Sequence, residues 1–374
     1  MADRAPMDHM RALGAMLQAA RDGGVWAGSI DEAFVESARR EDLAPLLYHA
    51  LRRAGAWDEQ PARCREALTA AARDAAAVDA VRCEVDRRVV STLDATGAQP
   101  LLFKGAALAH TCYAQSWLRP RADTDILIPR SKADEAARTL ERLGFSRVPR
   151  PVGDYVTHQF TYVAAVSGVR AEFDIHWKLS DPQAFADLFA HDELARDAMA
   201  VPALGPSARA IGDVHALLVA CIHRVAHHHD ELMPLFLSDI DLLARRLDSA
   251  SWSRVLSLAA SKRIRRVCAR GLGLSADLFG TSVPSAVSRG LASAGDEPGA
   301  AYLEKGLRKV DILMSDMRAL GWKARVRLLR EHLMPAPAYV LASYGTTQSW
   351  LLPALYVHRI ARGASRWFRP LGSR

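Results

Sequence analysis

The spacing of apolar residues divides the chain into helical regions on either side of a short segment with strand patterning. Before residue 99, apolar positions recur every three or four residues, as in "SIDEAFVESARREDLAPLLYHALRRAG". The stretch "PARCREALTAAARDAAAVDAVRCEVDRRVVSTLDATG" opens with proline and closes with glycine, which predicts one long helix. We therefore expect residues 1–98 to form an N-terminal helical region.

The pattern changes at residue 99, where short apolar runs replace the helical spacing. "QPLLFKG" and "DTDILIP" predict buried strands, and "AALAHTCYA" between them predicts the start of a helix. "SKADEAARTLERLGF" predicts a helix with Ser131 as its N-cap and Gly144 as its stop. The strands "HQFTYVAAV" and "VRAEFDIHWKL" meet at Ser167 and Gly168, which is typical of a hairpin turn. Residues 99–182 should thus form a compact α+β core.

Helical spacing returns after this core. "DVHALLVACIHRVAHHHDELMPLFLSDIDLLARRL" is typical of the stretch, and we expect residues 183–320 to form a C-terminal helical domain. Residues 321–374 mix prolines, aromatic residues and basic residues, which predicts a tail of short helices and loops. The expected fold is α+β, with a small mixed sheet and its helices flanked by helical regions.

The tail carries the positive charge of the protein. The formal net charge is +7 over 374 residues. Residues 323–374 contain nine Lys or Arg and one acid, which makes +8 and leaves −1 for the rest. This tail could bind an RNA phosphate backbone, an acidic membrane surface, or the acidic face of its own protein. We favour packing of its apolar face against the protein itself.

Cysteine usage and the N-terminus bear on the compartment. The five cysteines are far apart and form no C-x-x-C pair, so we expect reduced thiols in a cytoplasmic protein. The N-terminus carries acids and no long apolar stretch, so we expect no signal peptide. No apolar window is long enough for a transmembrane segment. The oligomeric state stays open.

Two aspartates interrupt the apolar strand in "ADTDILIP". Residues i and i+2 of a strand point to one face, so Asp123 and Asp125 should project together. Neighbouring buried carboxylates repel each other and call for a cation, and Mg²⁺ prefers oxygen ligands. Asp174, in a later strand of the same expected sheet, supplies a third carboxylate. We predict that these three residues are catalytic and hold two Mg²⁺ ions, with Mn²⁺ as a substitute.

The stretch "FKGAA" predicts a phosphate site beside the carboxylates. Gly105 lets the backbone approach a ligand, and the following helix N-terminus, including the backbone of Ala106, offers free N–H groups. Lys104 adds a positive charge. Arg119 and Arg121, just ahead of the aspartates, either bind phosphate or pair with acids.

Several histidines lie near these motifs. His176 shares a strand face with Asp174, and it is either a proton relay or acceptor-binding group or a structural histidine. His158 opens a strand and is a further candidate for the pocket. His223 and His227 share a helix face but lack the H-E-x-x-H pattern of zinc sites, so we expect a polar face beside the active site. His223, like His158, is a candidate for acceptor binding or proton relay.

A second Asp-x-Asp, formed by Asp239 and Asp241, falls in a predicted helix. Residues i and i+2 of a helix do not share a face, so this pair should not act as a unit. We expect Asp239 to bond to a neighbouring helix or histidine. We expect Asp241 to face solvent or to pair with Arg245.

The order of these motifs resembles the nucleotidyltransferases of the DNA polymerase β superfamily. More closely, residues 30–280 resemble a bacterial group of uncharacterised nucleotidyltransferases. The group shows a Lys-Gly turn, an Arg four residues before Asp-x-Asp, an Asp-x-His-Trp strand end, and a downstream helix with histidines and an Asp-Ile pair. The matching positions here are Lys104-Gly105, Arg119, Asp123/Asp125, Asp174 to Trp177, His223 with His227/His228, and Asp239-Ile240.

The resemblance implies an enzyme that moves a nucleoside monophosphate from a nucleoside triphosphate (NTP), such as ATP, to an acceptor hydroxyl and releases pyrophosphate. A small molecule, peptide or sugar is the preferred acceptor, with transfer RNA or protein second. The superfamily has a glycine pair or glycine-serine where this chain has Gly105-Ala106, so the serine that would touch the γ-phosphate is absent. This departure favours the alternative of a non-catalytic member that binds nucleotide or RNA.

Overall fold

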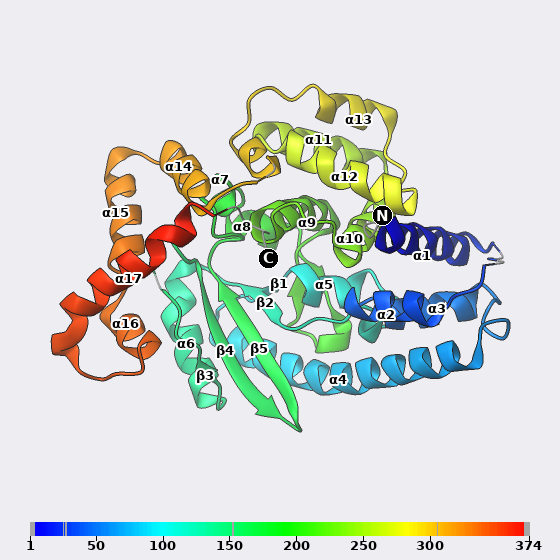
Figure 1. Ribbon diagram of the computed structural model, residues 1–374, viewed down its shortest axis with the longest axis horizontal. Helices are drawn as coiled ribbons and strands as arrows, with labels where there is room; N and C mark the ends of the chain where they lie inside the picture. The colour runs from blue at the N-terminus through cyan, green and yellow to red at the C-terminus, as the bar shows by residue number, and fades with distance from the viewer. Residues whose placement is uncertain (1–3, 25, 27, 152, 305, 370–374) are drawn as a thin grey trace.

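A computed structural model describes residues 4–24, 26, 28–151, 153–304 and 306–369 (Figure 1). Within these ranges it confirms an α+β fold, in which helices surround a mixed seven-stranded sheet of order β3-β4-β5-β2-β1-β7-β6. The strands are β1 Leu101–Leu102, β2 Thr124–Leu127, β3 Ser146–Arg147, β4 Gln159–Val166, β5 Val169–His176, β6 Met199–Ala200 and β7 Arg209–Ala210.

The centre of the sheet follows the predicted apolar runs. All four residues of β2 are buried, and β2 pairs in parallel with β5 and antiparallel with β1. The hairpin between β4 and β5 is confirmed, with positive φ at Ser167 (+49°) and Gly168 (+77°). A type I′ turn requires positive φ at both central residues.

The N-terminal region is helical, as predicted. Its helices are α1 Arg4–Asp22, α2 Glu32–Arg40, α3 Ala44–Arg53 and α4 Ala62–Ala95. The long helix α4 is the one that the Ala-rich stretch predicts. Val89, Val90 and Leu93 of α4 belong to the buried cluster that contains Leu102 and Ile126 of the sheet, so α4 forms one wall of the core beneath β1 and β2.

The remaining helices lie within the core and after it. They are α5 Lys104–Thr111, α6 Ala133–Arg142, α7 Gln183–Ala186, α8 His191–Arg196, α9 Asp213–His228, α10 Pro234–Arg246, α11 Ser249–Ser261, α12 Arg265–Phe279, α13 Ser285–Ala292, α14 Lys309–Ala319, α15 Trp322–Leu333, α16 Pro337–Ser343 and α17 Leu352–Trp367. Short 3₁₀ turns are η1 Ser116–Leu118, η2 Arg130–Lys132, η3 Pro202–Leu204, η4 Pro298–Leu303 and η5 Ser349–Leu351. No described helix is long and apolar enough to cross a membrane.

Two local predictions are wrong. Ser131 does not cap α6: it lies inside η2, and the N-cap of α6 is Lys132, whose side chain makes no capping bond. Residues 183–320 are not purely helical, because β6 and β7 extend the sheet and β7 pairs in parallel with β1. Strands of two residues are too short to give an alternating pattern. Gly144 does end α6, with φ of +89°.

The helices before and after the sheet share one core. Buried residues of α1, α2 and α3 belong to the same cluster as those of α9, α10 and α12. At Gly14 of α1, an added Cβ would lie 1.9 Å from the carbonyl oxygen of Leu278 on α12, so only glycine permits this approach. The helices before and after the sheet therefore pack as one body, and Figure 1 shows α1 next to α12. The domain boundaries stay a prediction.

Candidate active site

The strand register brings the predicted carboxylates together. In the parallel pair β2 and β5, Asp125 lies opposite Asp174, and Leu127 lies opposite His176. Ligand atoms of Asp125, Asp174 and His176 all lie within 4.8 Å of one another, and the three residues are buried. Asp123 lies one residue before β2 and lines the same cavity as Asp125.

Asp125 is the centre of this cluster. Its Oδ1 accepts hydrogen bonds from Lys104 Nζ at 2.7 Å and from His176 Nε2 at 2.8 Å. Burial by itself raises the pKa of Asp125, but the Lys104 ammonium and His176 together outweigh it and hold this pKa well below its usual range. Lys104 has φ of +51°, a conformation that costs energy for a residue with a side chain. The carboxylate of Asp125 is therefore ionised and held in place.

Two residues of β4 orient Asp174. Thr161 donates a hydrogen bond to its Oδ1 at 2.5 Å, and Gln159 Nε2 donates to its Oδ2 at 2.6 Å. Sequence reasoning missed both, although Gln159 and Thr161 are alternate polar residues in the apolar strand "HQFTYV". That alternation is the signal that could have found them, since i and i+2 share a strand face.

The negative charge of Asp123 has less positive charge near it than that of Asp125. Burial first, and then the charge of Asp125, raise its pKa, Lys104 offsets part of the shift, and the resulting pKa is about 6. Among the described residues, no Lys or Arg nitrogen lies within ion-pair distance of its carboxylate, whereas Asp125 has Lys104. Three carboxylates and one ammonium give the cluster a formal charge of −2, from −3 and +1.

A cavity of about 480 Å³ opens over this cluster. Its walls come from the sheet, from α5, from the α9–α10 region and from the turn between α2 and α3. Sequence reasoning missed the last of these walls, formed by Arg40, Glu41 and Asp42. These residues lie about sixty positions before the motif and show no pattern that links them to it.

A family model described as an uncharacterised nucleotidyltransferase matches residues 30–280. That range contains every residue of the cluster and every residue that lines the cavity. The chain belongs to this nucleotidyltransferase family. No curated protein matches it.

The Lys-Gly turn of this nucleotidyltransferase is fixed by a buried arginine. The Arg119 guanidinium binds Asp239 of α10 through Nε at 3.3 Å and Nη2 at 2.7 Å, and Tyr113 donates to the same carboxylate at 2.8 Å. An added Cβ at Gly105 would lie 2.5 Å from Arg119 Nη1. A side chain at position 105 would therefore displace the Arg119 guanidinium where it crosses the first turn of α5.

Two residues predicted for the phosphate site of the nucleotidyltransferase take other roles. The Arg121 side chain is 2% exposed and donates to Asp86 of α4 and to Thr124, both at 2.7 Å. It pairs with an acid on α4 rather than with the carboxylate cluster. The Ala106 side chain is fully buried in the core beneath the sheet. The side chain at position 106 therefore does not line the cavity, and only its backbone N–H lies in the first turn of α5.

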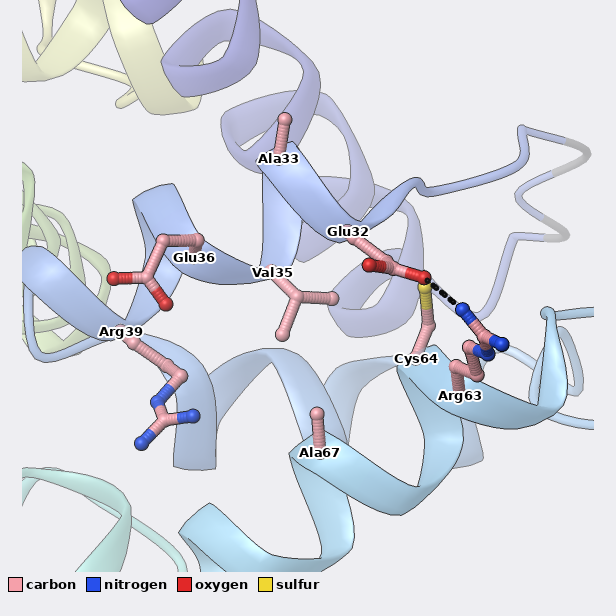
Figure 2. Close-up of a pocket in the computed structure, with 8 residues that line it drawn as sticks. All are labelled: Glu32, Ala33, Val35, Glu36, Arg39, Arg63, Cys64 and Ala67. Atoms are coloured by element: carbon pink, nitrogen blue, oxygen red, sulfur yellow. Dashed lines mark ion pairs between the residues drawn. The ribbon is translucent and has the colours of Figure 1, made fainter.

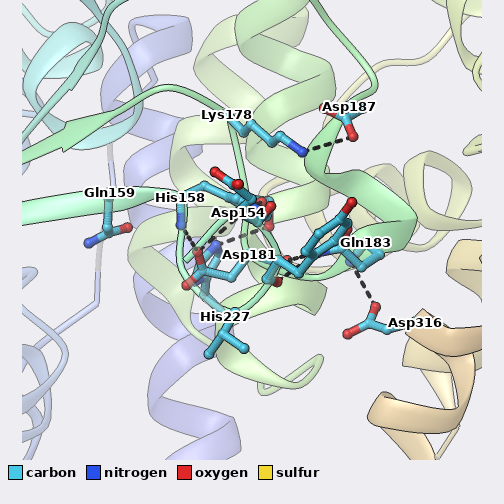
Figure 3. Close-up of polar contacts among 12 residues, drawn as sticks. Asp154, His158, Gln159, Lys178, Asp181, Gln183, Asp187, His227 and Asp316 are labelled. Atoms are coloured by element: carbon cyan, nitrogen blue, oxygen red, sulfur yellow. Dashed lines mark hydrogen bonds and ion pairs between the residues drawn. The ribbon is translucent and has the colours of Figure 1, made fainter. Parts of the chain in front are cut away.

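His158 lies outside the cavity of the nucleotidyltransferase. Its Nδ1 lies 3.1 Å from the carbonyl oxygen of Ser180, and its Nε2 lies 2.7 Å from that of Asp154. Figure 3 shows His158 inside a polar network with Asp181 and Gln183, and the ring is fully buried. This histidine holds two loops together, and the expectation that it lines the pocket is wrong.

A histidine group from α9 forms another wall of the cavity. His223 and His228 approach each other through their Nε2 atoms at 3.2 Å, and His227 Nε2 lies 3.1 Å from Ser180 Oγ. Burial, then the charge of Lys104, lowers the pKa of His227 to about 3 and that of His223 well below its usual range. The buried Nδ1 of His223 has no partner among the described residues. These rings are neutral.

The two residues of the helical Asp-x-Asp have separate partners, as expected, but Asp239 bonds to loop residues and not to a neighbouring helix or histidine. Asp239 bonds to Arg119, and Asp241 binds Arg245 Nε at 3.0 Å through both oxygens. Asp241 is fully buried and also accepts from Thr281 at 2.8 Å, so it does not face solvent.

A second hollow, of about 490 Å³, lies between α2 and α4 (Figure 2). Its charges are already compensated, because Arg63 pairs with Glu32 at 3.6 Å on exposed side chains. The Cys64 thiol on its floor is almost fully buried, and burial raises its pKa, which disfavours the reactive thiolate. The chemistry therefore concentrates at the sheet.

Proposed function

We propose that the protein transfers a nucleoside monophosphate from an NTP to an acceptor hydroxyl, with the help of divalent metal. The observation that carries the proposal is the pairing of Asp125 and Asp174 side by side on parallel strands, with His176 and Lys104 against them. In the reaction, the acceptor oxygen forms a bond to the α-phosphorus, the bond to the β-phosphate oxygen breaks, and pyrophosphate leaves. The hydroxyl proton passes to a base or to water.

The donor set suits a divalent cation. The formal charge of −2 on the cluster matches one such ion, and a triphosphate brings the negative charge for a second. Carboxylate oxygens from Asp123, Asp125 and Asp174 would hold Mg²⁺, while a nitrogen from His176 makes Mn²⁺ a good substitute. When bound, the ions stabilise charge on the phosphoryl oxygens and favour the ionised acceptor hydroxyl.

The chain itself orients the reactants. Lys104 stands at the start of α5, where it can contact a phosphate as well as Asp125. The first N–H groups of α5 have no partner within the helix, and they form an anion site beside the carboxylates. The Ala106 side chain is not needed for this cradle, because it faces the core. Thr161 and Gln159 hold Asp174 ready beside Asp125.

The acceptor is expected to enter between the sheet and the helical walls. Those walls carry both signs of charge, with Arg40 and Asp42 on one side and the neutral histidines of α9 on the other. A cleft of only about 480 Å³ favours a small molecule, a sugar or the end of a peptide over a folded macromolecule. Transfer RNA or protein would have to insert a single hydroxyl-bearing end.

The test uses the full-length protein with each of the four α-labelled NTPs and Mg²⁺ or Mn²⁺. We expect pyrophosphate release, with label on an added acceptor or on the protein, for at least one NTP. Asp174→Asn should abolish it, and Asp187→Asn, on an exposed carboxylate that pairs with Lys178, should leave it unchanged. Metal-dependent NTP binding without pyrophosphate release, across a broad set of hydroxyl acceptors, would instead establish a non-catalytic nucleotide-binding protein.

A further inference from the structure

The exposed apolar side chains gather at the C-terminal end of the molecule. Among the described residues, nine large hydrophobic side chains are exposed, and eight of them lie between Trp322 and Phe368. The ninth, Met314, lies on α14 just before them. We refer to α15, α16 and α17, residues 322–369, as the C-terminal arm. Figure 1 shows this arm at the edge of the molecule, on the side away from α1.

Helix α15 presents a continuous apolar stripe to solvent. With about 100° per residue, Trp322, Val326 and Leu333 fall within an arc of roughly 40°. Trp322 is 71% exposed and Val326 is 60% exposed. The opposite side of the helix carries Leu328, which is 1% exposed. The helix is therefore docked on the protein by one face and open on the other.

The open stripe is bordered by positive charge. Arg325 lies on one side of it, and Lys323 and Arg330 lie on the other, each within about 100° of Trp322 around the helix. Residues 322–369 hold eight Lys or Arg and a single acid, Glu331. That acid is engaged elsewhere, because the backbone amides of residues 154, 155 and 156 donate to it at 2.9–3.0 Å. The exposed charge of the arm is thus positive.

The apolar stripe continues onto α17. Leu333 of α15, Ile360 of α17 and Phe368 beyond its end line one shared groove. Trp350, in η5, is 75% exposed. Packing of the arm on the protein, which the sequence favoured, therefore accounts for Leu328 and other buried residues but leaves this surface open.

We propose that the C-terminal arm binds the surface of a membrane rich in anionic lipid. An amphipathic helix with an apolar stripe, bordering basic residues and exposed tryptophan has the composition of an interfacial helix. The apolar stripe enters the boundary between headgroups and acyl chains, and the arginines and lysines face lipid phosphates. The surface is separate from the carboxylate cavity, so the inference does not depend on nucleotidyl transfer.

Membrane is favoured over two other partners. RNA would leave the stripe uncovered, because six of the nine exposed side chains are aliphatic or methionine and offer no flat ring for a base to stack on. A second copy of the arm would bring two strongly positive surfaces together, which opposes association. A lipid surface offers acyl chains to the apolar side chains and phosphates to the basic side chains at the same time.

The test is flotation of the full-length protein with vesicles at physiological salt. Vesicles of phosphatidylcholine alone should bind weakly, and vesicles that also contain phosphatidylglycerol should carry the protein upward. The double variant Trp322→Ser/Val326→Ser should lose about ten-fold or more in binding, because both side chains are exposed and reach the lipid. Its circular dichroism and melting temperature should match the parent protein.

Two double variants with the same change in net charge distinguish binding by the arm from a general effect of positive charge. Arg327→Glu/Arg330→Glu, in the arm, should weaken flotation with anionic vesicles. It should also make the remaining flotation less sensitive to salt, because fewer charge contacts are left to screen. Arg73→Glu/Arg88→Glu, at exposed positions of α4, changes net charge by the same amount and should leave flotation intact. Equal loss in both pairs would show that net charge alone is responsible and would overturn the proposal.

Three other outcomes would also overturn it. The first is an absence of flotation with anionic vesicles. The second is binding of single-stranded RNA that the arm variants abolish, with no vesicle binding. The third is a dimer, seen by light scattering, that the Trp322→Ser/Val326→Ser variant disperses without any vesicle binding by the parent protein.

Discussion

The two Asp-x-Asp motifs of this chain have the same spacing but opposite surroundings. At the start of β2, Asp123 and Asp125 line one cavity, and among the described residues only Asp125 has an ammonium partner, that of Lys104. On α10, Asp239 and Asp241 point to different neighbours, and each has its own guanidinium. The strand thus concentrates negative charge, whereas the helix disperses and neutralises it. A motif therefore acquires its chemistry from the element that carries it.

The largest expected effect is on activity, at the strand motif. Asp125→Asn should lower the rate of nucleotidyl transfer by about 10³ or more, because positioning and charge neutralisation carry most of the catalysis of phosphoryl transfer. The rate of pyrophosphate release measures it. A loss smaller than about ten-fold would contradict the role that we assign to Asp125.

The next effect is on stability, at the helical motif. Asp239→Asn removes the charge opposite Arg119, whose side chain is 7% exposed, and should lower the free energy of unfolding by about 3 kcal/mol. Urea denaturation followed by circular dichroism measures it. Asp241→Asn is the matched control and should cost less, since the side chain of its partner Arg245 is 32% exposed. If Asp241→Asn costs more, the distinction between the two guanidinium partners is wrong.

A further buried carboxylate, that of Asp316 on α14, has no guanidinium partner among the residues that the structure describes. It extends the comparison to a property that depends on pH. Burial raises its pKa to about 6, although Gln183 N–H and Tyr302 O–H donate to it. The raised pKa means that the fold favours the protonated form. Its stabilising contribution is complete below the ordinary pKa of 3.8 and is lost as pH rises through about 6.

This effect is measured as the difference in the free energy of unfolding between the parent protein and the Asp316→Asn variant. The free energy of unfolding of the parent relative to Asp316→Asn should fall by about 2 kcal/mol between pH 4 and pH 7, at about 1.4 kcal/mol per pKa unit. The subtraction removes the titration of other groups. A difference that is constant with pH would show that Asp316 is ionised throughout this range.

The smallest effect has the opposite sign. Asp123→Asn in metal-free protein should raise the free energy of unfolding by about 1 kcal/mol, because it relieves repulsion with Asp125 at a site without its own cation. The melting temperature in the presence of a chelator measures it. Destabilisation by this substitution would mean that Asp123 has a structural partner, as Asp239 does.

The sequence predicts the parts of the fold that repeat along several residues. The long helix α4, the hairpin of β4 and β5 and the buried strand β2 each carry a periodic pattern. The edge strands β6 and β7 have two residues each, and their pairing depends on where the chain returns to β1. The sequence also placed Asp125, Asp174 and His176 on common faces, because strand alternation is local.

The partners of the arginines were beyond sequence reasoning. Arg119 and Arg121 are two residues apart, yet one pairs with Asp239 on α10 and the other with Asp86 on α4. Nothing in their local spacing distinguishes these partners, since both contacts depend on how distant helices pack. The buried position of Ala106 was also beyond sequence reasoning. The direction of its side chain depends on how α5 packs on the core, which no motif specifies.

The shared core of the outer helices has a consequence for synthesis. Helix α1 leaves the ribosome early, but its partner α12 follows only after the entire sheet has been made. Helices α2 and α3, which precede the sheet, can already cover part of the apolar face of α1, but the part that packs on α12 has no native partner until α12 is made. Folding of this chain is therefore completed late in translation, and a ribosome stall before α12 releases a product with that part of the face exposed.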